Sequence, residues 1–178
     1  MTRTRGFTLL ELMIAIAIVS ILASIAFFNN SNLAQSNKAE AFLLDLKRTL
    51  SFARAKATTS DEIVITCPVD PDELAARGTM SCTSNWSSNN IIVFVDDDNN
   101  GQHNDGDTLV RAMDLVSTGD TLTFSGTATI RFDSSGRVTS QTGSFLYCPA
   151  GSEENNQQLT LALSGNAFYS GDSDQTCL

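Results

Sequence analysis

The chain has 178 residues, 17% of them charged, and a formal net charge of −9. This length suits one folded domain with an appendage, and the acidic balance disfavours general binding to nucleic-acid phosphates. The sequence contains no phosphate-binding glycine loop, and its single histidine, His103, lies in a polar segment. We expect His103 to be a solvated loop residue, so triad or nucleophilic catalysis has no support and the chain is predicted not to be an enzyme.

An apolar segment follows a short basic start. Arg3 and Arg5 precede it, residues 12–28 contain no charge, and the next basic residue is Lys38. Residues 7–28 suffice for a helix that crosses about 30 Å of hydrocarbon. Because Lys and Arg favour the cytoplasmic side, we expect the N-terminus in the cytoplasm and the rest of the chain outside. An ordinary secretory signal and a plain membrane anchor are the alternatives.

One carboxylate, Glu11, stands near the start of this apolar segment. A lone charge in a membrane helix costs about 2.5–3.5 kcal/mol at the helix centre, and less near the interface. A carboxylate kept in such a place usually has a functional partner. Neither a cleaved secretory signal nor a plain anchor requires one.

The segment GFTLLE (Gly6–Glu11), followed by the apolar run 12–18, resembles the class III signal of type IV prepilins and pseudopilins. The resemblance implies that a prepilin peptidase cuts after Gly6 and that Phe7 becomes the N-methylated terminus. It also implies that Glu11 is retained for assembly, where it meets the N-terminal ammonium of a neighbouring subunit. The protein would then cross the bacterial inner membrane once, with its C-terminal domain in the periplasm, before it enters a pilus or pseudopilus.

A second helical pattern follows the apolar segment. Residues 29–32 interrupt the run with Asn and Ser side chains that compete for the backbone, so we expect weak helix there if the helix continues. Apolar residues then recur at helical spacing on one face, which predicts an amphipathic helix packed against a domain. The stripe consists of Ala39, Phe42, Leu43, Leu46, Leu50, Ala53 and Ala57.

Beyond Asp61 the pattern changes to short β-branched or aromatic runs separated by Gly, Asn, Asp and Ser. We therefore predict an α+β fold, type IV pilin-like, with the long N-terminal helix packed on antiparallel β-sheet. Trp86, just before a strand, should cover the edge of the core. The predicted strands are 62–67, 91–95, 108–111, 121–124, 127–132, 144–148 and 159–163. The predicted divisions are a leader (1–6), a transmembrane or filament-core half-helix (7–28), an amphipathic half-helix (29–58) and a β-rich globular domain (59–178).

Two segments of the β-rich part, 91–111 and 130–137, resemble the H-type minor pseudopilin and FimT/FimU minor pilin group. Cys148 and Cys177 fit the pilus branch of that group. The resemblance implies a low-copy subunit that helps to start or cap a filament. The implied partners are other minor and major pilins, the prepilin peptidase and an inner-membrane assembly platform.

The chain has four cysteines, Cys67, Cys82, Cys148 and Cys177. An even number on the exported side of a membrane favours disulfides, and the spacing lacks the close pairs of a zinc site. We predict Cys67–Cys82 and Cys148–Cys177, each closing a loop beside the end of a predicted strand. The other two pairings stay open, because sequence does not determine connectivity.

The segment 96–107 has the spacing of an EF-hand-type calcium loop, with Gly101 at the sharp turn. Position 12 of the loop holds aspartate instead of the usual bidentate glutamate, which would weaken the affinity. The alternative is a polar hairpin, since Asn-Gly and Asp-Gly form turns. No other cofactor is indicated. The candidate ligands are the side-chain oxygens of Asp96, Asp98, Asn100 and Asp107 and the backbone carbonyl of Gln102.

These features favour a minor pilin, a non-catalytic structural subunit of type IV pilus assembly. The nearest alternative is an H-type minor pseudopilin of a type II secretion system. A DNA-uptake minor pilin is another, but the basic Gly-Arg-x-Arg motif of such proteins corresponds here to residues 165–168, which contain no arginine. DNA is therefore not expected as a partner. A membrane-anchored periplasmic calcium-binding domain is the remaining alternative.

Overall fold

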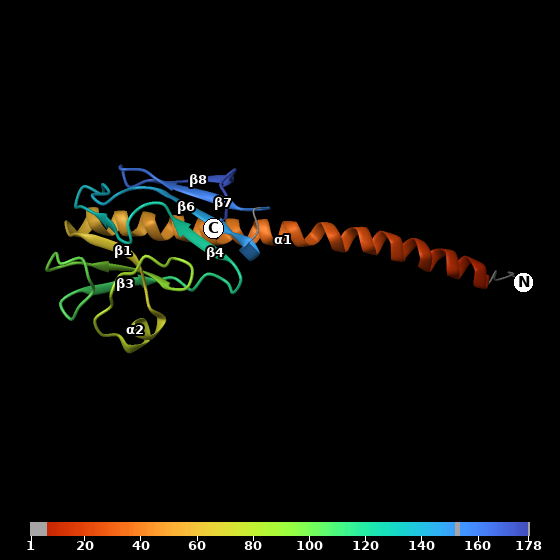
Figure 1. Cartoon of the computed structure of the whole chain (residues 1–178), viewed down its shortest axis with the longest axis horizontal. Helices are drawn as coiled ribbons and strands as arrows, with labels where there is room; N and C mark the ends of the chain where they lie inside the picture. Colours follow the sequence, from red (N-terminus) through yellow and green to blue (C-terminus); the bar gives the residue numbers. More distant parts are fainter. Residues whose placement is uncertain (1–6, 152–153, 178) are drawn as a thin grey trace, which may run out of the picture. The chain divides into compact units, whose positions relative to one another are not determined.

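The computed structural model describes residues 7–151 and 154–177, and only the backbone of residues 25–31. The fold is α+β, as predicted: the C-terminal half of a long helix, α1 (Leu9–Ser60), packs on two antiparallel sheets (Figure 1). The chain divides into two compact units, one ending at Gln35 and one starting at Ser36.

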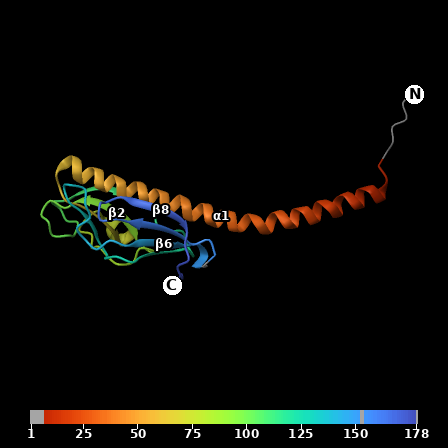
Figure 2. The same ribbon diagram turned by 90° about the horizontal axis from the view of Figure 1, so that it is seen from above.

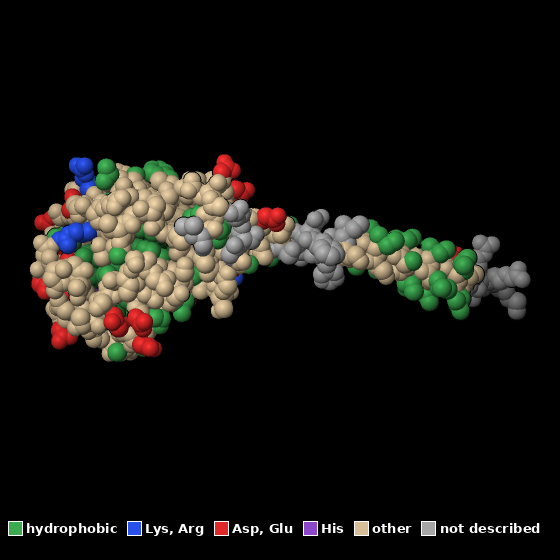
Figure 3. Space-filling view, in the orientation of Figure 1, with side chains coloured by type: hydrophobic (Ala, Val, Ile, Leu, Met, Phe, Trp, Pro, Cys, Tyr) green, Lys and Arg blue, Asp and Glu red, His purple; other side chains and the backbone are tan. Residues whose placement is uncertain are grey.

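The first unit contains the N-terminal part of α1. The helix starts at Leu9, two residues after the predicted start, and continues without a break through residues 29–32. The large hydrophobic side chains from Leu9 to Leu22 are exposed. Figure 3 shows hydrophobic side chains along the face of this segment that is in view. Among the described residues, no helical stretch is both long and apolar enough to cross a membrane.

The second unit contains the rest of α1, which carries the predicted apolar stripe on its buried face. All stripe residues except Phe42 are fully buried, and the half-buried Phe42 ring lies 5.2 Å from the ring of Tyr147. Figure 2 shows this part of the helix running along one side of the sheets. The buried stripe contacts side chains of both sheets in one hydrophobic cluster, so the helix joins the two sheets into one core.

The first sheet has the strand order β3-β2-β1-β5. Its strands are β1 (Val64–Val69), β2 (Asn90–Val95), β3 (Thr108–Ala112) and β5 (Ile130–Phe132). Every residue of β1 is buried, because α1 covers one face of the sheet and a second hydrophobic cluster covers the other. The segment that follows β1 lies over that second cluster and includes the short helix α2 (Pro71–Ala76).

The second sheet has the order β4-β6-β7-β8. Its strands are β4 (Thr121–Phe124), β6 (Ser144–Cys148), β7 (Gln157–Leu161) and β8 (Ala167–Asp172), and a short 3₁₀ turn, η1 (Pro149–Gly151), follows β6. Trp86 is 3% exposed and packs edge-on against Phe124 and Phe145 of this sheet. The prediction that Trp86 covers the core edge is confirmed.

Sequence reasoning missed two elements, β8 and α2. β8 has the sequence AFYSGD, which contains no β-branched residue and ends in Gly-Asp, a combination that is typical of turns. It also contains Gly171 in the left-handed region and a register shift against β7. Asp70 is the N-cap of helix α2 and accepts a hydrogen bond from the backbone N–H of Asp72, and Pro71 is the first helical residue. Asp-Pro before a short acidic run is a helix-start signal that could have identified α2.

Three predicted strands have boundaries that are displaced by more than one residue. The predicted strand 62–67 lies at 64–69, because Val64 is the first residue that pairs with both β2 and β5. The predicted strand 127–132 is reduced to β5, and 159–163 lies at 157–161. The ends of a strand depend on where its partner strand pairs with it, and a short run of sequence does not reveal that partner.

The end of α1 is held to two turns of the sheets by Arg54. Its Nε donates to the Gly136 carbonyl at 3.2 Å, and its Nη1 donates to Asn166 Oδ1 at 3.1 Å. Gly165 has a φ of 78°, and a Cβ there would collide with the Gly136 carbonyl oxygen. Only glycine fits this position, because the turns at 133–137 and 162–166 touch through their backbones.

Two disulfides join Cys67 to Cys82 and Cys148 to Cys177, the pairing that we expected. The first holds the segment with α2 over the second hydrophobic cluster, to which Cys67 itself belongs. The second ties the C-terminal segment to the end of β6.

Candidate functional site: the N-terminal segment and the acidic loop

The start of α1 is capped by a reciprocal pair of side chains, Thr8 and Glu11. The backbone N–H of Glu11 donates to Thr8 Oγ1 at 3.2 Å, and Glu11 Oε2 accepts from the backbone N–H of Thr8 at 3.0 Å. The Thr8 hydroxyl also donates to the same carboxylate oxygen at 3.1 Å. This is a capping box, which satisfies N–H groups that the first helical turn leaves unpaired.

Glu11 therefore has a local role that sequence reasoning overlooked. The signal was present, since Thr-x-x-Glu before an apolar run is the pattern of a capping box. The expected partner of Glu11, the ammonium of a neighbour, remains a prediction. Phe7 is the first described residue and its side chain is 90% exposed, whereas Gly6 and the rest of the leader lie outside the described residues.

The hydroxyl groups of the apolar segment are satisfied within the helix. Ser20 Oγ donates to the Ile16 carbonyl at 2.7 Å, and Ser24 Oγ donates to the Ser20 carbonyl at 2.8 Å. A hydroxyl that bonds to the carbonyl four residues earlier presents no unpaired donor to its surroundings. These serines are thus compatible with an apolar environment, and Glu11 is the only ionised group of the described segment 7–24.

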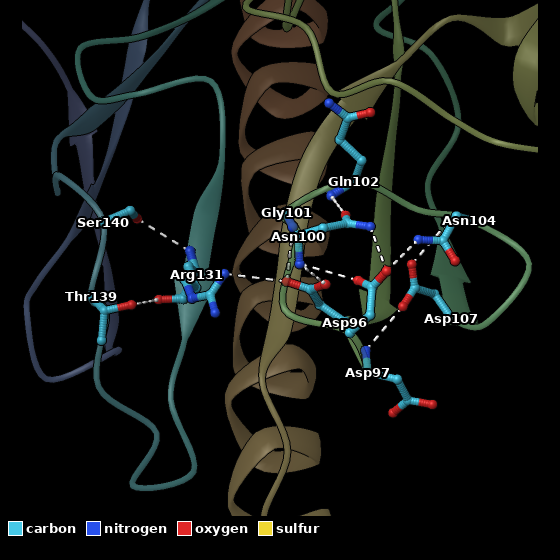
Figure 4. Close-up of polar contacts among 11 residues, drawn as sticks. Asp96, Asp97, Asn100, Gly101, Gln102, Asn104, Asp107, Arg131, Thr139 and Ser140 are labelled. Atoms are coloured by element: carbon cyan, nitrogen blue, oxygen red, sulfur yellow. Dashed lines mark hydrogen bonds and ion pairs between the residues drawn. The ribbon is translucent and has the colours of Figure 1, made fainter.

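The acidic loop connects β2 to β3, and its carboxylates converge (Figure 4). One oxygen from each of Asp96, Asp98 and Asp107 lies within 4.8 Å of the others. Asp107 accepts the backbone N–H groups of Asp97 and Asn104, each at 2.9 Å. The loop folds around its own acidic side chains, which serve as acceptors for N–H groups that the hairpin leaves unpaired.

Asp96 is the buried member of the cluster, with 3% exposure. It accepts N–H groups of Asn100 and Gly101, both at 3.1 Å, and the Arg131 guanidinium from β5 at 3.2 Å. Burial raises the pKa of Asp96, and these hydrogen bonds and the Arg131 charge oppose that rise. At the exposed Asp98, a hydrogen bond from the Asn104 side chain holds the pKa below its ordinary value.

The structure brings the three carboxylates among the predicted calcium ligands together, and Asn100 lies beside them. Asn100 turns its amide nitrogen toward Asp98 Oδ2 at 2.7 Å, and its amide oxygen accepts the Gln102 N–H at 2.7 Å. Both ends of this amide are therefore engaged inside the loop. The remaining three carboxylates suit a hard cation, but loop N–H groups and Arg131 already neutralise them in part. Calcium binding stays a prediction.

The prediction that His103 is a solvated loop residue was wrong. The residue is 8% exposed, and its ring stands edge-on against Phe94 with 5.5 Å between centroids. Its carbonyl accepts the Met80 N–H at 2.9 Å, so the segment pinned by Cys67–Cys82 lies against it. A polar neighbourhood in sequence did not reveal this burial, because the covering segment comes from elsewhere in the chain.

Sequence reasoning also missed a buried polar junction around Asp120. Its Oδ2 accepts the Tyr147 hydroxyl at 2.5 Å and lies 2.7 Å from Lys38 Nζ, and its Oδ1 accepts the Ala150 N–H at 2.8 Å. Burial would raise the pKa of Asp120, but the bonds from Lys38, Tyr147 and Ala150 outweigh it and hold the pKa below its usual value. Burial and the nearby carboxylate raise the pKa of Tyr147, which stays a donor at neutral pH.

Comparisons with known proteins agree with the fold and with the N-terminal segment. The solved structures that resemble the fold include two crystal forms of the type IV minor pilin FimU of Pseudomonas aeruginosa. The TM-scores are 0.61 and 0.57 at 14% identity, with 80% of this chain and 96% and 98% of the FimU chains covered. A comparison with curated proteins gave no significant match.

Two family models match the chain directly. Residues 1–27 match the prokaryotic N-terminal methylation motif, and residues 44–166 match the type II transport protein GspH. The second match spans most of the chain, from the amphipathic half of α1 to the turn before β8. The chain therefore belongs to the GspH family, a group of type IV pilin-like proteins, and has the fold seen in the minor pilin FimU.

Proposed function

We propose that this protein is a minor pilin, a non-catalytic subunit that helps to initiate a type IV pilus. The observation that carries the proposal is the N-terminal segment. It combines a methylation motif with a capped helix whose apolar side chains are exposed from Leu9 to Leu22. Exposed apolar surface of this extent needs a partner, either lipid or other helices.

In the proposed mechanism, a prepilin peptidase removes the leader after Gly6 and Phe7 is methylated. The segment 7–28 is held in the inner membrane and is then transferred by the assembly platform into the filament core. There Glu11 pairs with the N-terminal ammonium of a neighbouring pilin, which replaces the hydration that both charges lose. The β-rich domain, which remains outside the core, contacts other minor and major pilins.

A second candidate function is that of an H-type minor pseudopilin in type II secretion. The family match to the type II transport protein GspH favours this candidate. The N-terminal methylation motif is compatible with both candidates, because both systems use subunits with this segment. Deleting the gene in its host separates the two. Loss of surface pili with normal protein secretion supports the pilus, and loss of secretion with normal pili supports the second candidate.

The test of the assembly mechanism uses the capping box to separate two roles of Glu11. Glu11→Gln keeps an acceptor for the Thr8 N–H but removes the charge. Thr8→Ala removes the capping hydroxyl but keeps the carboxylate. We expect Glu11→Gln to lower the amount of protein in sheared filaments by about tenfold, because a buried ammonium is left unpaired. Thr8→Ala should assemble nearly as wild type.

Processing and membrane levels of each variant are the controls, measured by mass and immunoblotting. Both variants should be cleaved and retained in the membrane like the wild type. Wild-type filament levels for Glu11→Gln would contradict the ion-pair mechanism. A loss seen with Thr8→Ala and not with Glu11→Gln would assign Glu11 to helix capping alone.

A further inference from the structure

Strand β3 forms an edge of the first sheet, and a hollow of about 610 Å³ opens beside it, next to the end of α2 (Figure 1). Within the described chain, β3 pairs with β2 alone, and no other backbone hydrogen bond involves residues 108–112. We call the hollow the edge pocket. Its lining includes Leu74, Arg77, Met80, His103, Asp107 and Leu109.

The outer edge of β3 is open, unlike two other sheet edges. On β4, the Ser87 hydroxyl donates to the Leu122 carbonyl at 2.9 Å and accepts the Leu122 N–H at 2.8 Å. On β5, the Arg131 carbonyl accepts the Thr139 N–H at 2.9 Å. β3 has no such neighbour among the described residues, and it contains no proline or lysine, which commonly protect an exposed edge. Its outer N–H and C=O groups can therefore pair with an added strand.

The pairing of β3 with β2 determines where these groups and the side chains point. The Met113 N–H donates to the Ile91 carbonyl at 2.8 Å, so it points toward β2. Because the bonding direction alternates along an antiparallel strand, the Ala112 N–H points away from the sheet. Leu109 pairs with Phe94 of the second hydrophobic cluster, so its side chain lies on the same face as α2. An added strand would thus place every second side chain over the edge pocket.

The edge pocket combines an apolar base with one cation. Met80 and His103 are 1% and 8% exposed, whereas Leu109 is 37% exposed at the sheet edge. Arg77 is exposed and forms no ion pair with any residue that the structure describes. The carboxylate of Asp107 already accepts two loop N–H groups. The pocket is therefore complementary to a bulky apolar side chain with a carboxylate nearby in the same segment.

We propose that β3 binds an extended peptide segment of another protein as an added strand, with a bulky apolar side chain in the edge pocket and a carboxylate beside Arg77. Backbone hydrogen bonds supply affinity, and the pocket and Arg77 supply specificity. The strand of a second copy is a poorer occupant, because β3 carries Arg111 and no carboxylate. The inference goes beyond the proposed function and does not depend on which filament contains the protein.

The first experiment titrates fluorescently labelled peptides into the full chain in detergent micelles and measures anisotropy. The probes are capped octapeptides of alternating threonine and valine, with a central leucine and either glutamate or lysine at both ends. We expect the glutamate peptide to bind about fivefold more tightly than the lysine peptide, the size of one exposed ion pair. Hydrogen exchange followed by mass spectrometry should show that the glutamate peptide protects residues 108–112.

N-methylation of the glutamate peptide separates strand addition from contact by side chains alone. In an added strand, only one of the two alternating series of peptide N–H groups faces β3. Methylation of that series should lower the affinity by about tenfold, because several hydrogen bonds are lost together. Methylation of the other series should change it little.

Matched substitutions in the protein test the pocket and the cation. Leu109→Ser should weaken binding of the glutamate peptide by about tenfold, as expected when a central interface residue is lost. Leu163→Ser, at a leucine that is 59% exposed outside the pocket, should not. Arg77→Glu should reverse the preference toward the lysine peptide, whereas Arg137→Glu, at an exposed arginine outside the pocket, should preserve it. Fluorescence of the buried Trp86 verifies that each variant folds.

Three results would overturn the inference: no protection of residues 108–112 by the glutamate peptide, equal effects of the two N-methylated series, and unchanged binding to Leu109→Ser. Protection of 108–112 that rises with protein concentration in the absence of peptide would assign the edge to a second copy instead. The proposed function fails differently, through absence of the wild-type chain from filaments or normal assembly of Glu11→Gln, and neither result bears on the peptide titration.

Discussion

At the scale of single residues, Asp120 links three parts of the domain. Its carboxylate contacts Lys38 of α1, Tyr147 of β6 and the N–H of Ala150, and each of these groups lies far from Asp120 in sequence. The side chain of Asp120 is 5% exposed, whereas that of Lys38 is 43% exposed. The hydrogen bonds to the buried carboxylate should therefore matter more than the partly solvated ion pair.

We expect Asp120→Asn to reduce the free energy of unfolding at neutral pH by about 1–3 kcal/mol, because the hydrogen bonds to a charged acceptor are weakened. Urea unfolding followed by Trp86 fluorescence measures it, since Trp86 is the single tryptophan and is buried in the same core. Asp114→Asn, at an exposed aspartate, is the matched control and should change little.

The difference in stability between wild type and Asp120→Asn should also depend on pH. The pKa of Asp120 is lower in the folded chain than the value of about 3.9 in unfolded chains. Its contribution is therefore complete above about pH 4 and is lost as the pH falls through the folded pKa. The difference in stability between wild type and Asp120→Asn should shrink on acidification below about pH 4. A difference that grows on acidification would show that the carboxylate is not stabilised as described.

At the scale of elements, the acidic loop is a hairpin connection stabilised by its own carboxylates. We expect calorimetry to find no calcium site tighter than about 10⁻⁴ M, since three carboxylates without a bidentate glutamate form a weak site. Arg131 beside Asp96 weakens it further. Asp98→Asn is the control, because it removes one converging carboxylate. A micromolar dissociation constant that Asp98→Asn abolishes would contradict this expectation.

The segment between β1 and β2 depends on a covalent link. We expect non-reducing peptide mapping to recover Cys67 joined to Cys82 and Cys148 joined to Cys177. Replacing the first pair by serine should cost about 3 kcal/mol of stability in the loop-entropy model for a 15-residue separation. It should also expose His103, which this segment covers. A peptide that joins Cys67 to Cys148 would contradict the pairing.

At the scale of the whole molecule, processing decides what the protein becomes. We expect intact-mass analysis of the protein from its native host to show a chain that begins at N-methylated Phe7. Cleavage before the apolar segment leaves that segment in the product, which assembly requires. A strain without prepilin peptidase should contain the uncleaved chain. A mature protein that keeps Met1, or one that starts after Ala26, would contradict membership of a filament.

Much of this protein could be predicted from short-range patterns. The basic start, the apolar run and Glu11 define the N-terminal segment without reference to any other part of the chain. The stripe from Ala39 to Ala57 predicted the buried face of α1, because helical periodicity is a local property. The strands around Ile92 and Leu122 were equally clear, as β-branched and aromatic runs between turn residues.

Tertiary structure decided the features that depend on distant partners. Asp96 meets Arg131 across 35 positions, and Asp120 meets Lys38 from another element. His103 is buried because a segment pinned by a disulfide lies against it, and β8 is a strand because it pairs with the edge of β7. The sequence by itself determined what each segment tends to form, since propensity and periodicity act over a few residues. Which side chains meet was decided by packing, because contact between distant segments is energetically favourable only in the assembled core.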